Sequence, residues 1–195
     1  MSTAAPIGFL VLAAGHGRRF GGCKLTASFS ANQTVLGRVL DSIKPLQAPV
    51  CVVTSFSKKT VLTLAQKKGV DVITMPQDSA GLGDSIAFGV GATQHWGGWI
   101  LCLGDMPWIT TGIYRQVWEL ACDINAGQVA PMIAGRRGHP VFFNQQYAQA
   151  LCQLTGDTGA ASVIDPCALT AFPVADDALF KDVDRPEDLI GERSN

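Results

Sequence analysis

The sequence predicts a three-layer α/β/α sandwich, in which a mostly parallel sheet carries a small antiparallel insertion. Short apolar runs alternate with stretches of helical spacing, a glycine-rich loop follows the first run, and a lone aspartate follows a later one. Strands and helices that alternate along a chain form parallel sheets with helices on both faces. Because the chain has 195 residues, we expect a single domain over residues 1–195.

The composition is typical of a compact globular protein, with 47% hydrophobic and 16% charged residues. A formal net charge of -1 argues against a general nucleic-acid-binding protein. No apolar segment approaches the roughly 20 residues of a membrane-spanning helix. Six cysteines are scattered without the spacing of a metal site, and we expect most of them to be small buried hydrophobes. This usage predicts a reducing, cytoplasmic setting.

The run from Leu10 to Lys24 carries the strongest chemical signal. Its apolar beginning predicts a buried strand, and it lacks the charged segment that opens a signal peptide. The glycines are Gly15, Gly17, Gly21 and Gly22, and the cations are Arg18, Arg19 and Lys24. Glycines bring backbone N–H groups close to a ligand, and fixed cations add to them, so the loop suits polyphosphate. A tight connection with solvated arginines is the alternative.

Strands and helices then alternate. We expect a helix from Thr34 that stops near Pro45, strands over 50–54 and 70–74, and between them a helix over 58–68. Residues 27–33 are predicted to form a loop.

A second loop of small residues spans 77–86 and leads into a helix over 85–93. Because helix N-termini offer free N–H groups, Gly81, Gly83 and Ser85 are placed to line a ligand. An ordinary helix cap made by Asp84 or Ser85 is the alternative.

A strand is predicted over 99–103, and a lone acid, Asp105, follows its carboxyl end. Open α/β sheets bind ligands at that edge, and a carboxylate there suits Mg²⁺ held between protein and phosphate. A structural aspartate that caps the turn is the alternative. Thr110 or Thr111 is expected to cap a helix that runs to about Cys122.

Residues 128–133 and 138–143 predict two antiparallel strands joined by a turn, whose Arg136, Arg137 and His139 suit an anionic acceptor or a merely solvated turn. Helices are expected over 146–154 and, after a turn, within 155–164. The segment 180–189 predicts a last strand ending in acids, then a helix opened by Pro186. Asp182 and Asp184 would share one face of that strand.

Taken in order, these segments resemble one family. The loop Leu12–Lys24 resembles the signature loop of nucleotidyltransferases with a Rossmann-like, nucleotide-diphospho-sugar transferase-like fold. The segments 103–107, 138–141, 156–160 and 182–189 are similar to those of the molybdenum cofactor cytidylyltransferase group, which is related to the molybdenum cofactor guanylyltransferases. The resemblance spans nearly the whole chain.

The resemblance implies Mg²⁺-dependent transfer of CMP from CTP to the phosphate of molybdopterin, with release of pyrophosphate. It implies catalytic roles for Arg19, Lys24 and Asp105, and a metal held by Asp105 and Asp184. The implied nucleotide site is Leu12, Ala13, Ala14, Gly15, Gly17, Arg19, Lys24, Gly81 and Ser85, and the implied acceptor site is Arg137, His139, Pro140 and Asp157. A molybdoenzyme or its chaperone is an implied protein partner, and no nucleic acid or membrane is.

Departures from the family pattern bear on the choice of nucleotide, CTP or GTP. Gly17 stands where serine is usual, Phe20 where methionine is, and Met75 where asparagine is, whereas Ala14 in place of a second glycine favours the cytidylyl branch. The segment 26–33 also lacks the usual leucine-proline run.

Four rival functions can be weighed. The glycine spacing disfavours a dinucleotide-dependent dehydrogenase, and the lack of Gly-Lys-Ser/Thr excludes a P-loop enzyme. A non-catalytic carrier of the molybdenum cofactor and a transferase for a sugar or polyol phosphate stay open. Lys24, Asp105 and Asp184 together favour an enzyme over a carrier.

Overall fold

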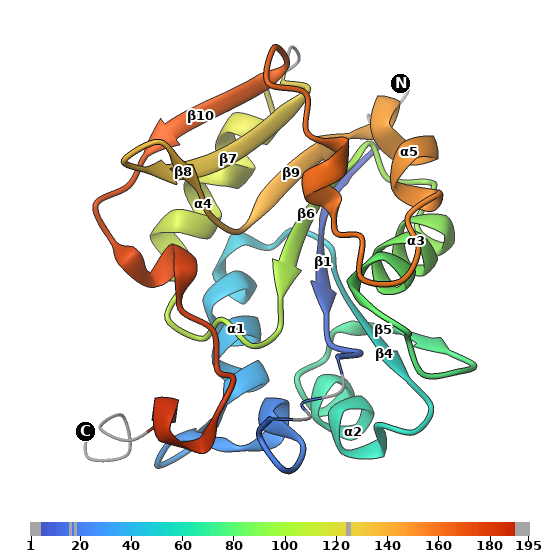
Figure 1. Cartoon of the computed structure of the whole chain (residues 1–195), viewed down its shortest axis with the longest axis vertical. Coiled ribbons are helices and arrows are strands. Elements are labelled where there is room, and N and C mark those ends of the chain that lie inside the picture. The colour runs from blue at the N-terminus through green and yellow to red at the C-terminus, as the bar shows by residue number, and fades with distance from the viewer. Residues whose placement is uncertain (1–4, 16, 18, 124–125, 190–195) are drawn as a thin grey trace.

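The protein is built on an eight-stranded sheet, seen in a computed structural model that describes residues 5–15, 17, 19–123 and 126–189 (Figure 1). Seven strands lie in the order β10-β7-β9-β6-β1-β4-β5, and β8 pairs with β7. The strands are β1 Ile7–Leu12, β4 Val50–Ser55, β5 Asp71–Met75, β6 Gly98–Leu103, β7 Gln128–Ile133, β8 Arg136–Arg137, β9 Val141–Asn144 and β10 Leu169–Pro173. A separate hairpin pairs β2 Ser28–Ser30 with β3 Gln33–Thr34.

Helices connect these strands in the described part of the chain. The α-helices are α1 Val35–Ile43, α2 Lys59–Lys67, α3 Leu82–Ala92, α4 Thr111–Ala121 and α5 Ala148–Cys152. Short 3₁₀ turns span Lys24–Thr26, Lys44–Leu46, Gln145–Tyr147, Ala160–Val163, Asp177–Phe180 and Pro186–Leu189. None of the described helices is long and apolar enough to cross a membrane.

The strand directions confirm the predicted mostly parallel sheet with an antiparallel insertion. β1 pairs in parallel with β4 and β6, β4 with β5, and β7 with β10. β9 lies between β6 and β7 and runs antiparallel to both. The chain order reverses at β1, which has β4 on one side and β6 on the other. Ligands bind at such switch points, outside the carboxyl ends of the strands.

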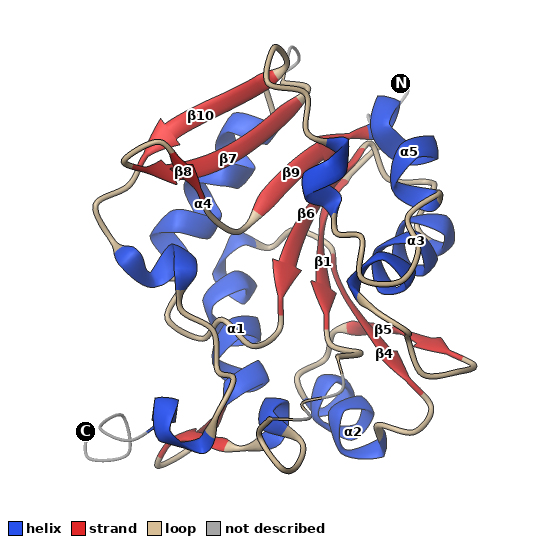
Figure 2. Ribbon diagram, in the orientation of Figure 1, coloured by secondary structure: helices blue, strands red, loops and turns tan. Residues whose placement is uncertain are grey.

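Alternating side chains of β1 pack into two apolar cores, one on each face of the sheet. Phe9 and Val11 join the core beneath α1, α2 and α4, whereas Leu10 and Leu12 join the core beneath α3 and α5. Successive side chains of a strand point to opposite faces, so an uninterrupted apolar run requires cover on both. Figure 2 shows α3 and α5 packed side by side on their face of the sheet. The sandwich is thus three-layered, as predicted.

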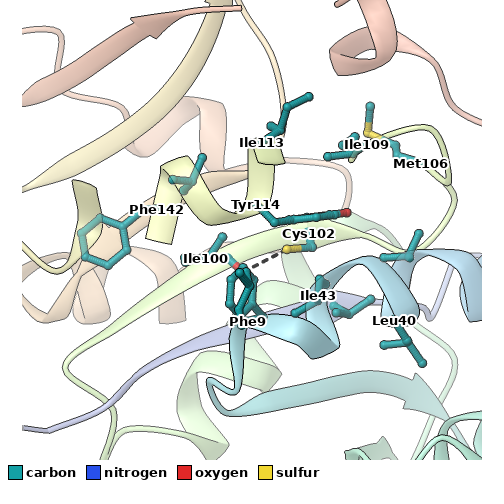
Figure 3. Close-up of a cluster of buried hydrophobic side chains, with 14 of the residues drawn as sticks. Phe9, Leu40, Ile43, Ile100, Cys102, Met106, Ile109, Ile113, Tyr114 and Phe142 are labelled. Atoms are coloured by element: carbon teal, nitrogen blue, oxygen red, sulfur yellow. Dashed lines mark hydrogen bonds between the residues drawn. The ribbon is translucent and has the colours of Figure 1, made fainter. Parts of the chain in front are cut away.

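The core beneath α1 and α4 holds the centre of the sheet in place. Phe9 and Tyr114 meet edge to face with ring centroids 6.0 Å apart, and Ile43 and Ile100 are buried beside them (Figure 3). Burying each side chain of this size contributes about 1.5–3 kcal/mol. This packing fixes β1 and β6, whose carboxyl ends carry the predicted site.

The predicted loop over 27–33 is instead the small β2–β3 hairpin. Phe29 of β2 and Val35 of α1 form a buried cluster with Val183 and Leu189 near the other end of the described chain. Figure 1 shows this late segment, in red, beside the blue hairpin. Contacts between segments so distant in sequence leave no local pattern, which is why sequence reasoning expected a plain loop.

The predicted last strand over 180–184 is wrong. Residues 177–180 form a 3₁₀ turn, and the segment that follows lies outside the sheet. The backbone nitrogen of Val183 nevertheless donates a hydrogen bond to the backbone carbonyl oxygen of Asp105 at 2.8 Å. The expected helix after Pro186 is one 3₁₀ turn. The last strand is β10, an edge strand in which only Phe172 is buried, so it lacks the apolar run that predicts a central strand.

The cysteines also differ from expectation. Cys51 and Cys102 are buried, Cys152 is half-buried, and Cys23, Cys122 and Cys167 are exposed. The prediction that most are buried is therefore wrong, because several lie at the ends of elements rather than inside apolar runs. All six are free thiols.

Candidate active site

A cleft of about 510 Å³ opens beyond the carboxyl ends of β1 and β6. Its wall includes every residue of the predicted nucleotide site: Leu12, Ala13, Ala14, Gly15, Gly17, Arg19, Lys24, Gly81 and Ser85. Asp105, Asp157 and Asp184 line the same cleft. The fold therefore gathers five segments that are separate in sequence around one space. Arg18, the other predicted cation of the loop, lies outside the described residues.

The glycine-rich loop turns sharply at Gly17, where the backbone takes a φ of 58°. A Cβ there would lie 2.9 Å from the carbonyl oxygen of Gly22, so only glycine fits without strain. Lys58, just before α2, donates from Nζ to the carbonyl oxygen of Gly15 at 2.6 Å. Sequence reasoning did not connect Lys58 with the loop, because 43 positions separate the two residues.

Lys24 occupies the charged centre of the cleft. Its Nζ lies 2.6 Å from Oδ2 of Asp105 and 3.9 Å from Oδ1 of Asp184, and its side chain is only 13% exposed. Arg19, which is largely exposed, donates to Oδ2 of Asp184 at 2.7 Å. Two cations and two carboxylates thus neutralise each other in a space where partial burial strengthens charge interactions.

The ion pair between Arg19 and Asp184 shifts the pKa of both groups toward their charged forms. The hydrogen bond from Arg19 lowers the pKa of Asp184 below its usual value, and the same bond raises the pKa of Arg19. Asp182 behaves in the opposite way: partial desolvation of its carboxyl, followed by the nearby charge of Asp105, raises its pKa. Two carboxylates that flank the same turn therefore have different proton affinities.

Backbone contacts bring Asp184 to the end of β6. Val183 is buried and bonds to the carbonyl of Asp105, while Oδ2 of Asp188 accepts from the backbone nitrogens of Asp184 and Arg185 at 2.8 and 2.7 Å. Asp184 lines the cleft and Asp182 does not. The geometry thus favours Asp184 as the partner of Asp105.

The two carboxylates fit a divalent cation of the magnesium type. Asp105 and Asp184 both approach Lys24 Nζ, so a position near that atom is within reach of both. Mg²⁺ is bound through one or two carboxylates, with waters and substrate phosphates as its remaining ligands. Within the described ranges, no group of three or more His, Cys, Asp or Glu side chains could hold a metal by itself. A metal here would accordingly need phosphate oxygens to complete its coordination.

The N-terminus of α3 forms the opposite wall. The cap position is Gly81, so the alternative of a cap by Asp84 or Ser85 is wrong, since the helix begins three residues earlier than predicted. Ser85 is buried and donates to Oγ of Ser79 at 3.1 Å, and Ser79 donates to the carbonyl of Gly81. Ser79 also lines the cleft. It was missed as a site residue, although it lies in the loop that sequence reasoning singled out.

A second, smaller cavity of about 120 Å³ adjoins the cleft, because Leu12, Leu82 and Leu103 line both. Arg137 and His139 of the predicted acceptor site line this cavity. The predicted Asp157 lines the larger cleft instead. Pro140 is buried and lines neither cavity.

The segment 138–140 is a bulge in an antiparallel hairpin. Met132 of β7 pairs with Arg137, whereas Val129 pairs with Phe142 of β9, so two extra residues lie between the two paired stretches. The bulge turns His139 toward the small cavity, while the guanidinium of Arg136 stacks on the ring of Phe180 at 4.3 Å. Arg136 and Arg137 therefore have different surroundings, which their adjacency in sequence does not reveal.

His139 is held neutral. Burial, and secondarily the charge of Arg137, lowers its pKa to about 4. Among the described residues, its buried Nδ1 has no hydrogen-bond partner. A buried ring nitrogen without a partner is costly, so a polar group of a bound molecule would stabilise it.

Comparison with known proteins shows the family to which this chain belongs. A family model described as the MobA-like NTP transferase domain matches residues 9–172. This range includes the glycine-rich loop, the α3 N-terminus, Asp105 and the hairpin bulge, but not Asp184.

The chain is 24% identical to the molybdenum cofactor cytidylyltransferase of Escherichia coli strain K12, over 93% of this chain and 92% of that protein. It is also similar to the crystal structure of Rv0371c from Mycobacterium tuberculosis H37Rv, with a TM-score of 0.80, 24% identity, and 95% and 96% of the two chains covered. A manganese complex of Rv0371c aligns with a TM-score of 0.72 and 22% identity over 88% and 89% of the chains. These likenesses confirm the nucleotide-diphospho-sugar transferase-like fold.

Proposed function

Because the chain belongs to the MobA-like NTP transferase domain family, it is a nucleotidyltransferase, and we propose that it transfers CMP from CTP to the phosphate of molybdopterin. The observation that carries the proposal is the position of Lys24 between Asp105 and Asp184 in the 510 Å³ cleft. The similarity to a molybdenum cofactor cytidylyltransferase over most of the chain supports the choice of reaction.

The triphosphate would lie along the glycine-rich loop. Because Gly15 and Gly17 have no Cβ, phosphate oxygens could come close to the backbone N–H groups of the loop. Arg19 and Lys24 would supply positive charge to the same oxygens. On binding, phosphate groups would replace the carboxylates as partners of these two cations. Asp105 and Asp184 would thereby be released to hold Mg²⁺, and the manganese complex of a structural relative supports a divalent metal in this fold.

The base and ribose would lie against the N-terminus of α3, where Gly81 and Ser85 line the cleft. Ala13 and Ala14, both buried at the end of β1, would form the opposite side. We propose CTP as the nucleotide because of Ala14 and of the relative's activity, with GTP as the alternative.

The acceptor would enter from the side of the second cavity. Arg137 would attract its phosphate, His139 Nδ1 would bond to its ring system, and Asp157 would close the space between acceptor and nucleotide. Pro140 would act through the shape of the bulge, since it lines neither cavity.

The proposed reaction needs no general base. An oxygen of the acceptor phosphate, already anionic at neutral pH, attacks the α-phosphorus of CTP. The bond from that phosphorus to the bridging oxygen breaks, and pyrophosphate leaves with the electron pair. Positioning and charge stabilisation supply most of the rate in such transfers. Lys24 would stabilise charge on the α-phosphate, and Mg²⁺ would neutralise charge on the triphosphate.

The test is pyrophosphate release in the presence of Mg²⁺, with CTP, GTP or ATP, and with or without molybdenum cofactor. Release that needs the cofactor, prefers CTP and is lost in Lys24→Ala and Asp105→Ala would support the proposal. Tight cofactor binding without release from any nucleotide would favour a carrier. Release that does not depend on molybdenum cofactor would direct the search to a different acceptor, such as a sugar or polyol phosphate.

A further inference from the structure

Asp84 joins two loops that line the cleft from different parts of the chain. It is the third residue of α3, and its Oδ2 accepts from the backbone nitrogen of Ala80 at 2.8 Å. Its Oδ1 accepts from the backbone nitrogen of Gly156 at 2.7 Å, across 72 positions of sequence. One carboxylate therefore ties the loop 79–85 to the loop 155–159.

Backbone contacts make this junction tight. The nitrogen of Gly83 donates to the carbonyl of Gly156 at 2.8 Å. A Cβ on Gly81 would lie 2.3 Å from the Gly156 carbonyl, and one on Gly83 would lie 2.6 Å from the carbonyl of Thr158. The two loops thus touch through their main chains, and a shift of one loop must displace the other.

The charge of Asp84 strengthens its two bonds. Hydrogen bonds to an ionised acceptor are roughly twice as strong as those between neutral groups. The backbone N–H of Gly156, and next that of Ala80, lowers the pKa of Asp84 below its usual value. The carboxylate is therefore ionised at neutral pH and holds both loops.

Each loop supplies walls of the cleft. Gly81 and Ser85 lie on one side of the junction, and Asp157 lies next to Gly156 on the other. Asp84 itself does not line the cleft. Its influence on bound molecules must therefore pass through the two loops that it connects.

We propose that Asp84 is a positioning residue that makes the loops 79–85 and 155–159 move as one unit, so that nucleotide binding at the first loop orders the second for the acceptor. This rests on the proposed function, in which the two loops serve different substrates. Such coupling is reciprocal and typically amounts to about 5–150-fold in affinity.

Amide hydrogen exchange with CTP and Mg²⁺ as the probe tests this coupling without the acceptor. In the wild-type protein, we expect CTP to slow exchange over 13–17, 79–86 and 154–160. In Asp84→Asn, which keeps the size of the side chain but removes one acceptor, we expect slowing over 13–17 and 79–86 but not over 154–160. Equal slowing over 154–160 in both proteins, or none there in the wild type, would overturn the inference.

A matched control is Asp165→Asn, because Oδ1 of Asp165 also accepts from a backbone nitrogen, that of Cys167 at 2.9 Å, within a local turn outside the cleft. We expect this variant to respond to CTP as the wild type does. If CTP slows no amide of the wild type, even over 13–17, the proposed nucleotide site fails and the coupling with it. That result differs from the loss of coupling alone.

Kinetics provide a readout that a purely structural role would not produce. In Asp84→Asn, we expect the KM for molybdenum cofactor at saturating CTP to rise about 10-fold. The Kd for CTP alone and the Tm should stay close to the wild-type values. A parallel loss of CTP affinity and Tm would show that Asp84 only stabilises the fold, and would overturn the proposed coupling.

Discussion

Two regions of the molecule meet at the cleft, and they are built differently. The first region, residues 7–105, supplies the glycine-rich loop and Asp105 from the ends of parallel strands buried on both faces. The second region, residues 126–189, supplies His139 from a bulge, Asp157 from a loop and Asp184 from a segment outside the sheet. In the first region, the ends of buried strands place the site residues. In the second region, contacts between segments distant in sequence place them.

This difference predicts unequal consequences of substitution. Residues of the first region should affect every nucleotide-dependent step, because they surround the charged centre of the cleft. Residues of the second region other than Asp184, which reaches that charged centre, should affect mainly the acceptor. Three experiments test this division, and a fourth tests the buried state of His139 in the second region.

The largest effect is expected for Lys24→Ala. Removing the ammonium between Asp105 and Asp184 leaves two carboxylates facing the phosphates, so kcat for pyrophosphate release should fall about 10²-fold or more. Lys68→Ala is the matched control, because Lys68 pairs with Asp41 at 2.7 Å away from the cleft. A similar fall in both variants would show that loss of stability, not of chemistry, is responsible.

Gly17→Ala should weaken binding of CTP about 10-fold. The added Cβ meets the carbonyl of Gly22 and also strains a left-handed backbone, which costs about 1–2 kcal/mol. Gly21→Ala has the same backbone strain at a φ of 73° but open space around the Cβ, so titration calorimetry should show a smaller loss. Equal losses would mean that strain alone decides the affinity.

Arg137→Ala should raise the KM for the acceptor about 10-fold and leave the affinity for CTP nearly unchanged, since a hydrogen bond to a charged group contributes about 1.5 kcal/mol at the lower end of its range. Its neighbour Arg136 stacks on Phe180 instead of lining the second cavity, so Arg136→Ala should leave the KM unchanged. Steady-state kinetics with both substrates varied would measure this. An equal rise in both variants would contradict the assignment of Arg137.

The smallest effect concerns acid stability. Burial lowers the pKa of His139 to about 4, below the value of 6.5 in the unfolded chain, so the unfolded state takes up the proton first. Stability should therefore fall as the pH drops below 6.5 toward 4, by about 1 kcal/mol at pH 5.5. Urea unfolding of His139→Gln should lack this component. The same pH dependence in variant and wild type would exclude His139 as its source.

Sequence reasoning predicted the first region well. β1, β4 and β6 are buried apolar runs, β5 is a half-buried edge strand, and the expected bounds of all four lie within a few residues of the observed ones. Because these strands are parallel, their carboxyl ends lie at the same edge of the sheet. The meeting of the glycine-rich loop with Asp105 therefore follows from the pattern alone.

The second region was less predictable, for identifiable reasons. β10 buries only Phe172 and lacks a continuous apolar run, and the segment around Val183 looks like a strand because acids flank one apolar residue. The contact of Asp84 with Gly156 joins the two regions across a long stretch of sequence, and that of Lys58 with Gly15 does the same within the first region. Nothing in either local sequence indicates the partner.

The reversed direction of β9 has a consequence for how this protein can change. Because β9 runs against β6, with Leu101 paired to Val141, the start of β9 lies at the edge where β6 ends. The bulge 138–140 thus reaches the ligand edge by a short hairpin, without a crossover helix. The pairs of β9 with β6 and β7 involve residues 141–144 and none of 138–140. Under the proposed function, exchanging this turn should change the preference for the acceptor and leave the glycine-rich loop unaltered.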